Sequence, residues 1–371
     1  MIKILHVVSG LGSGGVETML YNYYLIMDRT KIQFDFIVHD PNYGELESKF
    51  ENLGCKIYHV TPKKDSFIKN ANELYQIIHN GKYDIVHSHQ NLSSFLALLI
   101  AKITKVRVRI AHSHVWYIYE SWFQKLTRYP FKLLTKYFST DWFACSKDAS
   151  EWLFGDKENS NRLYIINNAI DIQKYQFNDE TRKEVRSYYG WEDNFVVGNV
   201  ARFFPEKNHS FLIDIFKEIH NDCPNAILLL IGGEGNDDNL RNKVNHLGLS
   251  DKILFFGVRN DVHILMQAMD VFILPSKFEG FGMVFVESQA ASLKTYASTA
   301  VPTETKITDL IEYISLNDSP SLWAKKVLSN HQKYERHSVF KDLINSGFDI
   351  KSEALKLTNI YQSIYYDSNR N

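Results

Sequence analysis

The chain has 371 residues, of which 44% are hydrophobic, so it is long enough to form two domains with two buried cores. Its formal net charge of −1 gives no support to nucleic-acid binding. The three cysteines, Cys55, Cys145 and Cys223, are too widely spaced for a disulfide framework or a zinc knuckle, and they fit a reducing cytoplasm. No apolar run approaches the ~20 residues that span a bilayer, and the apolar start of the chain is too short for a signal peptide.

Short apolar segments alternate with longer amphipathic segments through the first half of the chain. Segments that are apolar throughout are typical of parallel strands covered on both faces, and their alternation with helices indicates a doubly wound α/β sheet. The expected strands are Lys3–Ser9, Ile32–Val38, Cys55–His59, Tyr83–His87, Arg107–His112, Trp142–Ala144 and Leu163–Ile166. The expected helices are Val16–Met27, Ser66–His79, Ser93–Ile103 and Ser121–Phe138.

The same alternation begins again after a polar, charged segment at 172–194, which we interpret as a link between domains that contains a short helix. The expected elements of the second domain are the strands Phe195–Ala201, Ala226–Ile231, Ile253–Phe256 and Val271–Leu274 and the helix Asn208–Ile219. From Ser319 onward the pattern is helical, without a strand signal. We therefore expect two doubly wound, Rossmann-like domains at 1–173 and 174–350, facing each other across a cleft, and a helix at 351–371 that could pack back on the first domain.

A glycine-rich turn joins the first expected strand to the first expected helix. It reads Ser9-Gly10-Leu11-Gly12-Ser13-Gly14-Gly15-Val16-Glu17. Glycines let backbone N–H groups approach an anion, and the helix N-terminus adds a positive dipole. Gly10, Gly12 and Gly15 also satisfy the Gly-x-Gly-x-x-Gly pattern of dinucleotide-binding folds, with Asp40 after the next strand. Three interpretations remain open: contact with a phosphate or an acceptor, NAD binding, or a tight turn without a ligand.

Two cations follow the first expected strand of the second domain. Arg202 comes directly after the strand, and Lys207 lies five residues further on, at the start of a helix. Arginine offers a rigid fork and lysine a point charge, so the two could clamp a diphosphate and stabilise it as a leaving group. Without other motifs in the chain, the favoured interpretation of this pair would be two solvated cations on a loop.

Two carboxylates and two glycines follow the expected strand that ends at Leu274. Glu279 falls on the loop at the carboxyl end of the strand, and Glu287 falls about one turn into the helix that begins near Met283. Gly280 and Gly282 would let backbone amides reach a phosphate or a sugar. Both carboxylates could accept hydrogen bonds from hydroxyl groups; a general acid–base pair and simple helix capping are the alternatives.

Four motifs resemble those of the retaining glycosyltransferases of family 4, which have the GT-B architecture. They stand along the chain in the same order as in the family. Glu279-Gly280-Phe281-Gly282 followed by Glu287 is similar to the family's Glu-x7-Glu signature, and Arg202-x4-Lys207 resembles its diphosphate clamp. The other two motifs are Gly14-Gly15-Val16-Glu17, which resembles the N-terminal Gly-Gly loop, and Ala111-His112-Ser113-His114, which resembles the segment with the active-site histidine. The resemblance extends from residue 5 to about 310 and points to enzymes of bacterial capsule and exopolysaccharide clusters.

The resemblance implies a role for each of these residues. Arg202 and Lys207 would hold the donor diphosphate, Glu279 the hydroxyls of the donor sugar, and Glu287 the ribose. His112 would orient the sugar or the acceptor near the reacting carbon; the alternative is a structural cap at a strand end. The other donor-binding residues that it implies are Gly14, Gly15, Gly280, Phe281 and Gly282, with Arg259 and Asn260 near the base.

The sequence departs from the family pattern after Glu287, where Ser292 and Lys294 stand at positions that usually hold glycine and proline. A serine adopts that turn only at some conformational cost, which puts the shape of this loop in doubt. The sequence contains no Asp-x-Asp triplet, the usual means by which other glycosyltransferases hold a divalent ion on the diphosphate. We therefore expect no metal and no cofactor, the nucleotide sugar being a substrate.

The expected helix 121–138 has the composition of a membrane-surface helix. Its basic residues are Lys125, Arg128, Lys132 and Lys136, and Trp122, Phe123, Phe131, Leu134 and Phe138 lie among them; Pro130 should kink it. This pattern favours an interfacial helix facing anionic lipid, while a core-packed helix with a solvated basic face is the alternative. We expect a cytoplasmic protein, peripheral on the inner face of the plasma membrane if the helix binds lipid.

These features and the resemblance together predict a metal-independent hexosyltransferase, and the resemblance implies retention at the anomeric carbon. The expected reaction moves a hexose from a nucleoside-diphosphate sugar, UDP-linked in the favoured version, to a sugar hydroxyl of a growing, lipid-linked saccharide. The alternatives are a sugar-nucleotide epimerase of the same architecture, an NAD-dependent dehydrogenase that uses the N-terminal glycine-rich turn, and a catalytically silent nucleotide-sugar-binding subunit. The sequence names neither the sugar nor the acceptor.

Overall fold

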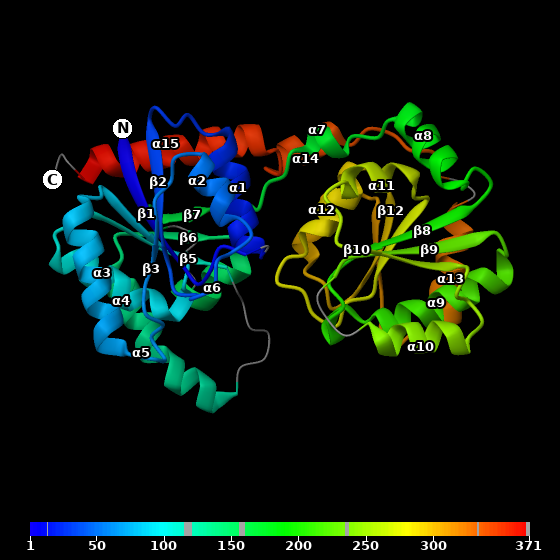
Figure 1. Ribbon diagram of the computed structural model, residues 1–371, viewed down its shortest axis with the longest axis horizontal. Helices are drawn as coiled ribbons and strands as arrows, with labels where there is room; N and C mark the ends of the chain where they lie inside the picture. The colour runs from blue at the N-terminus through cyan, green and yellow to red at the C-terminus, as the bar shows by residue number, and fades with distance from the viewer. Residues whose placement is uncertain (13, 115–120, 156–159, 234–236, 332–333, 369–371) are drawn as a thin grey trace. The chain divides into compact units, whose positions relative to one another are not determined.

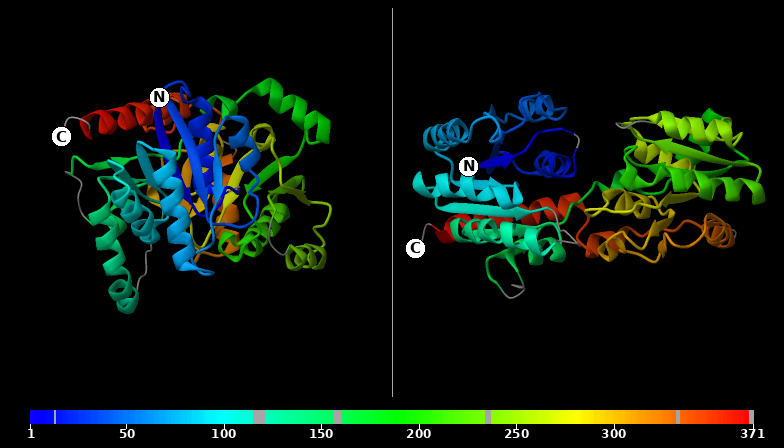
Figure 2. Two further views of the ribbon diagram at one scale, coloured as in Figure 1. Left: turned by 60° about the vertical axis from the view of Figure 1, so that its left-hand side comes forward. Right: turned by 90° about the horizontal axis from the view of Figure 1, so that it is seen from below.

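The computed structural model describes the chain except residues 13, 115–120, 156–159, 234–236, 332–333 and 369–371 (Figure 1). The chain forms two compact units, one made of residues 1–170 and 349–371 and the other of residues 171–348. The sequence analysis placed the corresponding divisions at 173/174 and 350/351. Each unit is an α/β domain with helices on both faces of a parallel sheet (Figures 1 and 2).

The first unit contains a seven-stranded parallel sheet with the order β3-β2-β1-β4-β5-β6-β7. Its strands are β1 (Ile2–Val8), β2 (Ile32–Val38), β3 (Ile57–His59), β4 (Ile85–Ser88), β5 (Val108–Ser113), β6 (Asp141–Ala144) and β7 (Leu163–Ile165). Its helices are α1 (Gly15–Ile26), α2 (Glu47–Asn52), α3 (Phe67–Gly81), α4 (Ser94–Ile103), α5 (Trp122–Phe138), α6 (Lys147–Phe154) and α15 (Ile350–Ser368), with a 3-10 turn η1 at Asn91–Ser93. The order confirms the expected doubly wound sheet, since it reverses between β1 and β4.

The two faces of this sheet are covered by different helices because side chains alternate along each strand. Ile4 and Val8 of β1 belong to the core cluster that includes residues of α1 and α15. Leu5 and Val7 belong to the cluster built with residues of α3 and α4. The last helix, α15, therefore returns to the first unit and covers one face of its sheet, as Figure 1 shows in red.

The second unit contains a six-stranded parallel sheet with the order β10-β9-β8-β11-β12-β13. Its strands are β8 (Phe195–Val200), β9 (Ala226–Ile231), β10 (Ile253–Gly257), β11 (Val271–Leu274), β12 (Lys294–Ser298) and β13 (Ile311–Ile314). Its helices are α7 (Ile172–Tyr175), α8 (Asp179–Tyr189), α9 (His209–Asp222), α10 (Asp238–His246), α11 (Val262–Ala268), α12 (Met283–Ala290), α13 (Pro320–His331) and α14 (Phe340–Asn345), with 3-10 turns η2 (Pro205–Lys207) and η3 (Thr303–Thr305).

Two strands of this sheet, β12 and β13, are absent from the strands that the sequence analysis expected. β12 reads Lys-Thr-Tyr-Ala-Ser, in which polar residues break the apolar run, yet four of its five residues are buried. Thr295 satisfies its hydroxyl by a 2.8 Å hydrogen bond to the Ser288 hydroxyl, so a polar residue is tolerated in the interior. The polar residues break the apolar run by which a buried strand is recognised in a sequence. The strand forms nevertheless, because tertiary hydrogen bonds pair these polar groups.

The turn between α12 and β12 carries the conformational cost that the sequence predicts. Ser292 is buried and has a φ of 53°, in the left-handed region that favours glycine. Its carbonyl accepts a 2.9 Å hydrogen bond from the Tyr334 hydroxyl, and its amide bonds the carbonyl of Gln289. The fold therefore keeps the turn that glycine would have made, with a serine held in place by its neighbours.

Candidate active site

The loops that follow β8 and β11 lie side by side because these strands are hydrogen-bonded neighbours. Val271 of β11 is in register with Val197 of β8, so both strands end at the same edge of the sheet. The backbone N–H of Lys277 donates a 2.7 Å hydrogen bond to the carbonyl of Glu206, which joins the two loops directly. In a parallel α/β sheet this carboxyl edge is where ligands bind.

Lys207 and Glu279 form a close ion pair at this edge. The ammonium of Lys207 lies 2.8 Å from one carboxylate oxygen of Glu279 and 2.7 Å from the other. Ser276 donates a third hydrogen bond, of 2.7 Å, to the same carboxylate. The side chain of Glu279 is 6% exposed and that of Lys207 19%, so the pair is mostly desolvated. Two residues 72 positions apart in the sequence are thus brought together.

Arg202 follows β8 on the same edge of the sheet. Its guanidinium carbon lies 4.8 Å from the ring centre of Phe204, so the guanidinium stacks on an aromatic face and its position is constrained. Arg202 thus lies just past β8, and Lys207 lies in the 3-10 turn η2 just before α9, close to where the sequence analysis placed them, while their role on a diphosphate stays a prediction.

The glycine loop before α12 has the backbone shape that only glycine supplies easily. Gly282 has a φ of 85° and occupies the N-cap of α12, and a Cβ there would meet the Phe285 ring at 2.7 Å. A Cβ at Gly280 would meet nothing within 4 Å, so space is open beside this backbone. Phe281 stacks on Phe348, with ring centres 5.6 Å apart.

Glu287 lies on α12 and is half-buried against α7. Desolvation raises the pKa of its carboxyl to about 7, and a hydrogen bond with Tyr175 opposes this rise. Burial, followed by the charge of Glu287, raises the pKa of Tyr175 well above its usual range. Glu287 is therefore a carboxyl group whose protonation changes near neutral pH.

The two residues expected near a base differ in their surroundings. Arg259 makes a bidentate contact with Asp261, with nitrogen–oxygen distances of 2.8 and 2.5 Å, and this contact holds the pKa of Asp261 below its usual value. Asn260, between them in the chain, is exposed. Arg259 is thus fixed by a neighbour, and Asn260 faces solvent.

In the first unit, the expected glycine loop begins α1 as predicted. Gly14 is the N-cap of this helix and Gly15 is its first residue. A Cβ added at Gly15 would meet nothing within 4 Å, and one added at Gly14 would meet only the flexible carboxylate of Glu17. The backbone is therefore open at Gly15, beside a helix N-terminus of the kind that binds anions, while the Glu17 carboxylate lies beside Gly14; Ser13 lies outside the described residues.

His112 lies near the end of β5 and is fully buried, and it is one of five clustered histidines. The others are His6 of β1, His87 and His89 at the end of β4, and His114 after β5. His87 Nε2 lies 3.1 Å from His112 Nδ1, and the ring centres of His112 and His114 are 3.9 Å apart. Burial lowers the pKa of His87 and His112 well below the usual value, so both rings are neutral.

Of this cluster, the sequence analysis quoted His112 and His114 in one motif and assigned a role only to His112. The missed signal is a repeated His-x-His pattern, since His87-Ser88-His89 and His112-Ser113-His114 end two strands that a doubly wound order makes neighbours. Alternate residues of a strand share one face, so these four imidazoles had to meet. Two groups of three bring one ligand atom per ring within 4.8 Å: His6, His87 and His89, and His89, His112 and His114. Neutral imidazoles of this kind are the form that binds metal ions.

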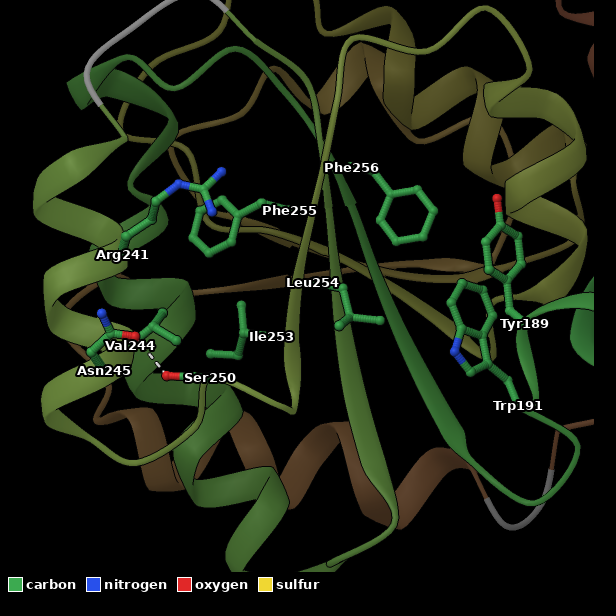
Figure 3. A pocket seen from close by; sticks show the side chains of 10 residues that line it. All are labelled: Tyr189, Trp191, Arg241, Val244, Asn245, Ser250, Ile253, Leu254, Phe255 and Phe256. Carbon is green, nitrogen blue, oxygen red and sulfur yellow. Dashed lines mark hydrogen bonds between the residues drawn. The ribbon is translucent and has the colours of Figure 1, made fainter.

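A hollow in the second unit lies elsewhere, along the edge strand β10. It is a cavity of about 640 Å³ with Tyr189 and Trp191 on one side of the strand and Arg241 and Asn245 on the other (Figure 3). None of the sequence-predicted site residues lines it. The candidate active site is therefore defined by its ion pair and loops rather than by this hollow.

Two family models match the chain in sequence. Residues 13–174 match glycosyltransferase family 4, and residues 181–311 match glycosyl transferases group 1. The chain is 29% identical over 380 residues to the glycosyltransferase EpsF of Bacillus subtilis, covering 99% of this chain and 98% of EpsF. It is 25% identical over 374 residues to the capsular polysaccharide biosynthesis glycosyltransferase CapH of Staphylococcus aureus, covering 98% and 99%.

A third relative is named for its substrates, the UDP-Gal:alpha-D-GlcNAc-diphosphoundecaprenol alpha-1,3-galactosyltransferase of Escherichia coli. It is 26% identical over 384 residues, covering 97% of this chain and 96% of its own length. Among solved structures, Anabaena HepE in complex with UDP has a TM-score of 0.78 at 20% identity, covering 98% of this chain and 100% of that one. HepE has also been solved with UDP-glucose, with the same TM-score.

The fold and these matches define the class of protein: a glycosyltransferase with two Rossmann-like domains of the GT-B type. The first half of the chain matches the glycosyltransferase family 4 model, the second half matches the group 1 model, and one full-length relative is named for capsular polysaccharide biosynthesis. This finding favours sugar transfer over the dehydrogenase, epimerase and silent-subunit alternatives. In the described part of the chain, no helix is both long and apolar enough to cross a bilayer.

Proposed function

We propose that this glycosyltransferase moves a hexose from a UDP-sugar to a sugar hydroxyl of a growing, lipid-linked saccharide, with retention at the anomeric carbon. The UDP and UDP-glucose complexes of HepE support UDP as the nucleotide. The relative from Escherichia coli, named for UDP-Gal and a diphosphoundecaprenol acceptor, supports both the donor and the lipid-linked acceptor.

The observation that carries the proposal is the desolvated pair of Lys207 and Glu279 at the carboxyl edge of the second sheet. The ammonium is held where it can turn from the carboxylate to a diphosphate oxygen, and the carboxylate then accepts hydrogen bonds from hydroxyls of the donor sugar. Because the pair is mostly buried, each of these charge-assisted contacts is stronger than it would be in solution. Arg202 adds a second cation for the departing diphosphate.

Retention follows in this proposal without a covalent enzyme intermediate. With the donor bound, Glu279 accepts hydrogen bonds from Ser276 and from hydroxyls of the donor sugar, so its oxygens are engaged as acceptors rather than free to attack the anomeric carbon. The leaving phosphate takes the proton of the acceptor hydroxyl while the new glycosidic oxygen bond forms on the same face from which the phosphate departs. The anomeric configuration of the product, read by its proton coupling constant, checks this step.

The diphosphate is held without a divalent ion in this proposal. Arg202, Lys207 and the backbone at the N-terminus of α12 supply the positive charge, and Gly280 and Gly282 let backbone amides approach the phosphates. Glu287 binds the ribose, Arg259 and Asn260 lie near the base, and His112 orients the sugar or acceptor from the first unit. Transfer that continues in excess EDTA is the expected result.

Helix α5 is the membrane-binding element in this proposal, which makes the enzyme peripheral on the inner face of the plasma membrane. Trp122, Phe123, Leu126 and Tyr129, in its first two turns, are all more than half exposed. Exposed aromatic and aliphatic side chains next to Lys125 suit the interface of an anionic membrane. The enzyme would then bind its lipid-linked acceptor at the membrane surface, where the acceptor is anchored.

A melting-temperature screen against UDP-, GDP- and ADP-sugars tests the donor. A ligand that binds only the folded state at 100 times its Kd adds about 2.7 kcal/mol to the free energy of unfolding. We expect UDP-sugars to raise the melting temperature and the other sugar nucleotides to leave it unchanged. A shift with GDP- or ADP-sugars alone would replace UDP as the donor, and a shift with NADH alone would contradict sugar transfer.

A further inference from the structure

The five clustered histidines lie on one face of the first sheet, beneath α15. His6 of β1 is in register with His87 of β4, and His112 of β5 follows two residues after Ile110, the register partner of His87. Alternation along the strands therefore points these rings to the side on which Tyr361 of α15 packs. The hydroxyl of Tyr361 lies 2.8 Å from His87 Nδ1.

The ring nitrogens form two hydrogen-bonded chains. One joins Tyr361 to His87 Nδ1, and His87 Nε2 to His112 Nδ1 at 3.1 Å. The other joins His6 Nδ1 to His89 Nε2 at 2.9 Å, and His89 Nδ1 to His114 Nε2 at 2.8 Å. Two nitrogens bound at ~2.0–2.1 Å to one tetrahedral zinc would lie about 3.3 Å apart. The observed distances thus fit hydrogen bonds better than shared metal coordination.

Counting protons fixes how the first chain can be arranged. Tyr361 carries one O–H, and each neutral imidazole carries one N–H, so three protons serve two hydrogen bonds. One proton is left over at one end of the chain, either on the Tyr361 hydroxyl or on His112 Nε2. A buried donor without an acceptor costs about 1–3 kcal/mol, so the end at which an acceptor can arrive decides the direction.

The two ends of the chain differ in what can reach them. Tyr361 is fully buried, with the rings of Phe34 and Phe143 centred 6.2 and 6.0 Å from its own. Among the described residues, the hydroxyl of Tyr361 has His87 as its hydrogen-bond partner, and a proton pointing elsewhere would face these rings. His112 Nε2 is buried and has no hydrogen-bond partner in the same part of the chain. It lies at the carboxyl end of β5, the edge at which this fold receives substrate.

We propose that Tyr361 and His87 are positioning residues that fix His112 as its Nε2–H tautomer, so that this N–H donates to an oxygen of the sugar or acceptor. The Tyr361 hydroxyl donates to His87 Nδ1, and His87 Nε2–H donates to His112 Nδ1, which leaves the single proton of His112 on Nε2. This inference rests on the proposed role of His112. It also assigns a function to the return of the C-terminal helix, which delivers Tyr361 to His87, 274 positions earlier in the chain.

The tautomer of His112 is measured directly on the full-length protein with ¹⁵N-labelled histidine. The nitrogen chemical shifts of an imidazole separate a protonated nitrogen from a bare one, and the His112→Gln variant identifies its signals. We expect a protonated Nε2 and a bare Nδ1 in the wild type. A protonated Nδ1, or zinc bound in stoichiometric amount on the histidines of the purified protein, would overturn the relay.

Kinetics of Tyr361→Phe test whether the relay matters for transfer, since this change removes only the hydroxyl. We expect kcat to fall about tenfold, with KM for the donor within twofold of the wild type, and the preference of His112 for the Nε2–H form to weaken. Tyr23→Phe is the matched control, because Tyr23 is also buried in this core and its hydroxyl donates a 2.6 Å hydrogen bond to the Asn167 carbonyl instead. It should lose comparable stability and keep kcat.

Two further outcomes separate this inference from the proposed function. If Tyr361→Phe and Tyr23→Phe have the same kcat, the relay is overturned even when His112→Ala is inactive. If His112→Ala transfers sugar at the normal rate, the proposed role of His112 is overturned, whatever tautomer is found. An inactive His112→Ala together with a tenfold loss in Tyr361→Phe alone supports both.

Discussion

At the scale of single residues, Glu287 shows how burial sets a charge. An exposed glutamate has a pKa near 4.5, and desolvation on α12 raises the pKa of Glu287 to about 7. Between these two values the folded protein binds more protons than the unfolded chain. The contribution of Glu287 to the free energy of unfolding is therefore greatest at low pH and is lost as pH rises from about 4.5 to about 7.

Glu287→Gln should remove this pH dependence. At pH 4 the variant and the wild type should have similar free energies of unfolding, because Glu287 is then mostly protonated in both the folded and the unfolded chain. At pH 8 the variant should be more stable by on the order of 1 kcal/mol or more, since the wild type must keep a desolvated carboxylate. Urea unfolding at the two pH values measures the difference. Glu180→Gln, on the exposed surface of α8, is the control, and a Glu287→Gln curve parallel to it would contradict the assignment.

The sequence predicts the position of a residue well where the residue follows a strand. It predicts a contact poorly where the partner residue is distant in the sequence. Lys207 and Glu279 could be placed at one edge of a sheet because each follows an apolar run, but their direct pairing depends on β8 and β11 being neighbours. Tyr361 gives no sequence signal, since a tyrosine within an amphipathic helix is typical of core packing. Its contact with His87 exists only because α15 returns to the first unit.

At the scale of elements, α5 departs from a simple core-packed helix. Ser121 and Gln124 form a capping box at its N-terminus, so the helix begins where the sequence predicts although its first two turns are exposed. The expected basic face is partly used within the domain: the Lys136 ammonium bonds the Phe154 carbonyl at 3.0 Å, and that of Lys132 lies 4.3 Å from the Trp152 ring centre. The exposed apolar turns around Lys125 remain available to a membrane.

Replacing Trp122 and Phe123 with serine should abolish binding to anionic vesicles. The two side chains are 76% and 61% exposed, so their loss should leave the melting temperature nearly unchanged while it removes apolar area that enters the lipid interface. Co-sedimentation with vesicles of phosphatidylcholine containing phosphatidylserine measures the bound fraction. Tyr188→Ser, an 81% exposed tyrosine on α8, is the matched control and should bind as the wild type does. Equal binding of all three proteins would exclude α5 as the anchor.

Whole elements were predictable from periodicity in the first unit and less so in the second. Every strand from β1 to β11 overlaps an expected apolar segment, because parallel strands buried on both faces read as continuous hydrophobic runs. β12 and β13 themselves contain polar residues. The polar side chains make hydrogen bonds with neighbouring residues, as Thr295 does with Ser288. Hydrogen bonds that form only in the folded state cannot be read from a local pattern.

At the scale of the whole molecule, the C-terminal helix completes the unit with which the chain begins. Ile350, Ala354, Leu357, Tyr361 and Ile364 of α15 all lie in the core cluster of the first unit. Burying a large apolar side chain contributes about 1.5–3 kcal/mol, so these residues together contribute on the order of 10 kcal/mol, which is comparable to the whole stability of a domain.

Removal of residues 349–371 should therefore unfold the first unit and leave the second folded. Differential scanning calorimetry should show that one unfolding transition is lost and one is kept. A matched pair of point variants tests the same face: Leu357 is 3% exposed and Leu355 is 63% exposed. Leu357→Ala should cost about 2–5 kcal/mol, and Leu355→Ala should cost little. Retention of both transitions after truncation would contradict the packing of α15 on the first unit.

The central claim is that Lys207, paired with Glu279, grips the diphosphate of the donor. Calorimetric titration of UDP-sugar into Lys207→Ala and into Lys277→Ala tests it most directly, because Lys277 is an exposed lysine on the adjoining loop whose backbone, not its side chain, joins the two loops. With both variants folded by circular dichroism, we predict that Lys207→Ala raises the Kd at least tenfold, about 1.4 kcal/mol, and that Lys277→Ala leaves it unchanged. Wild-type affinity in Lys207→Ala would contradict the account.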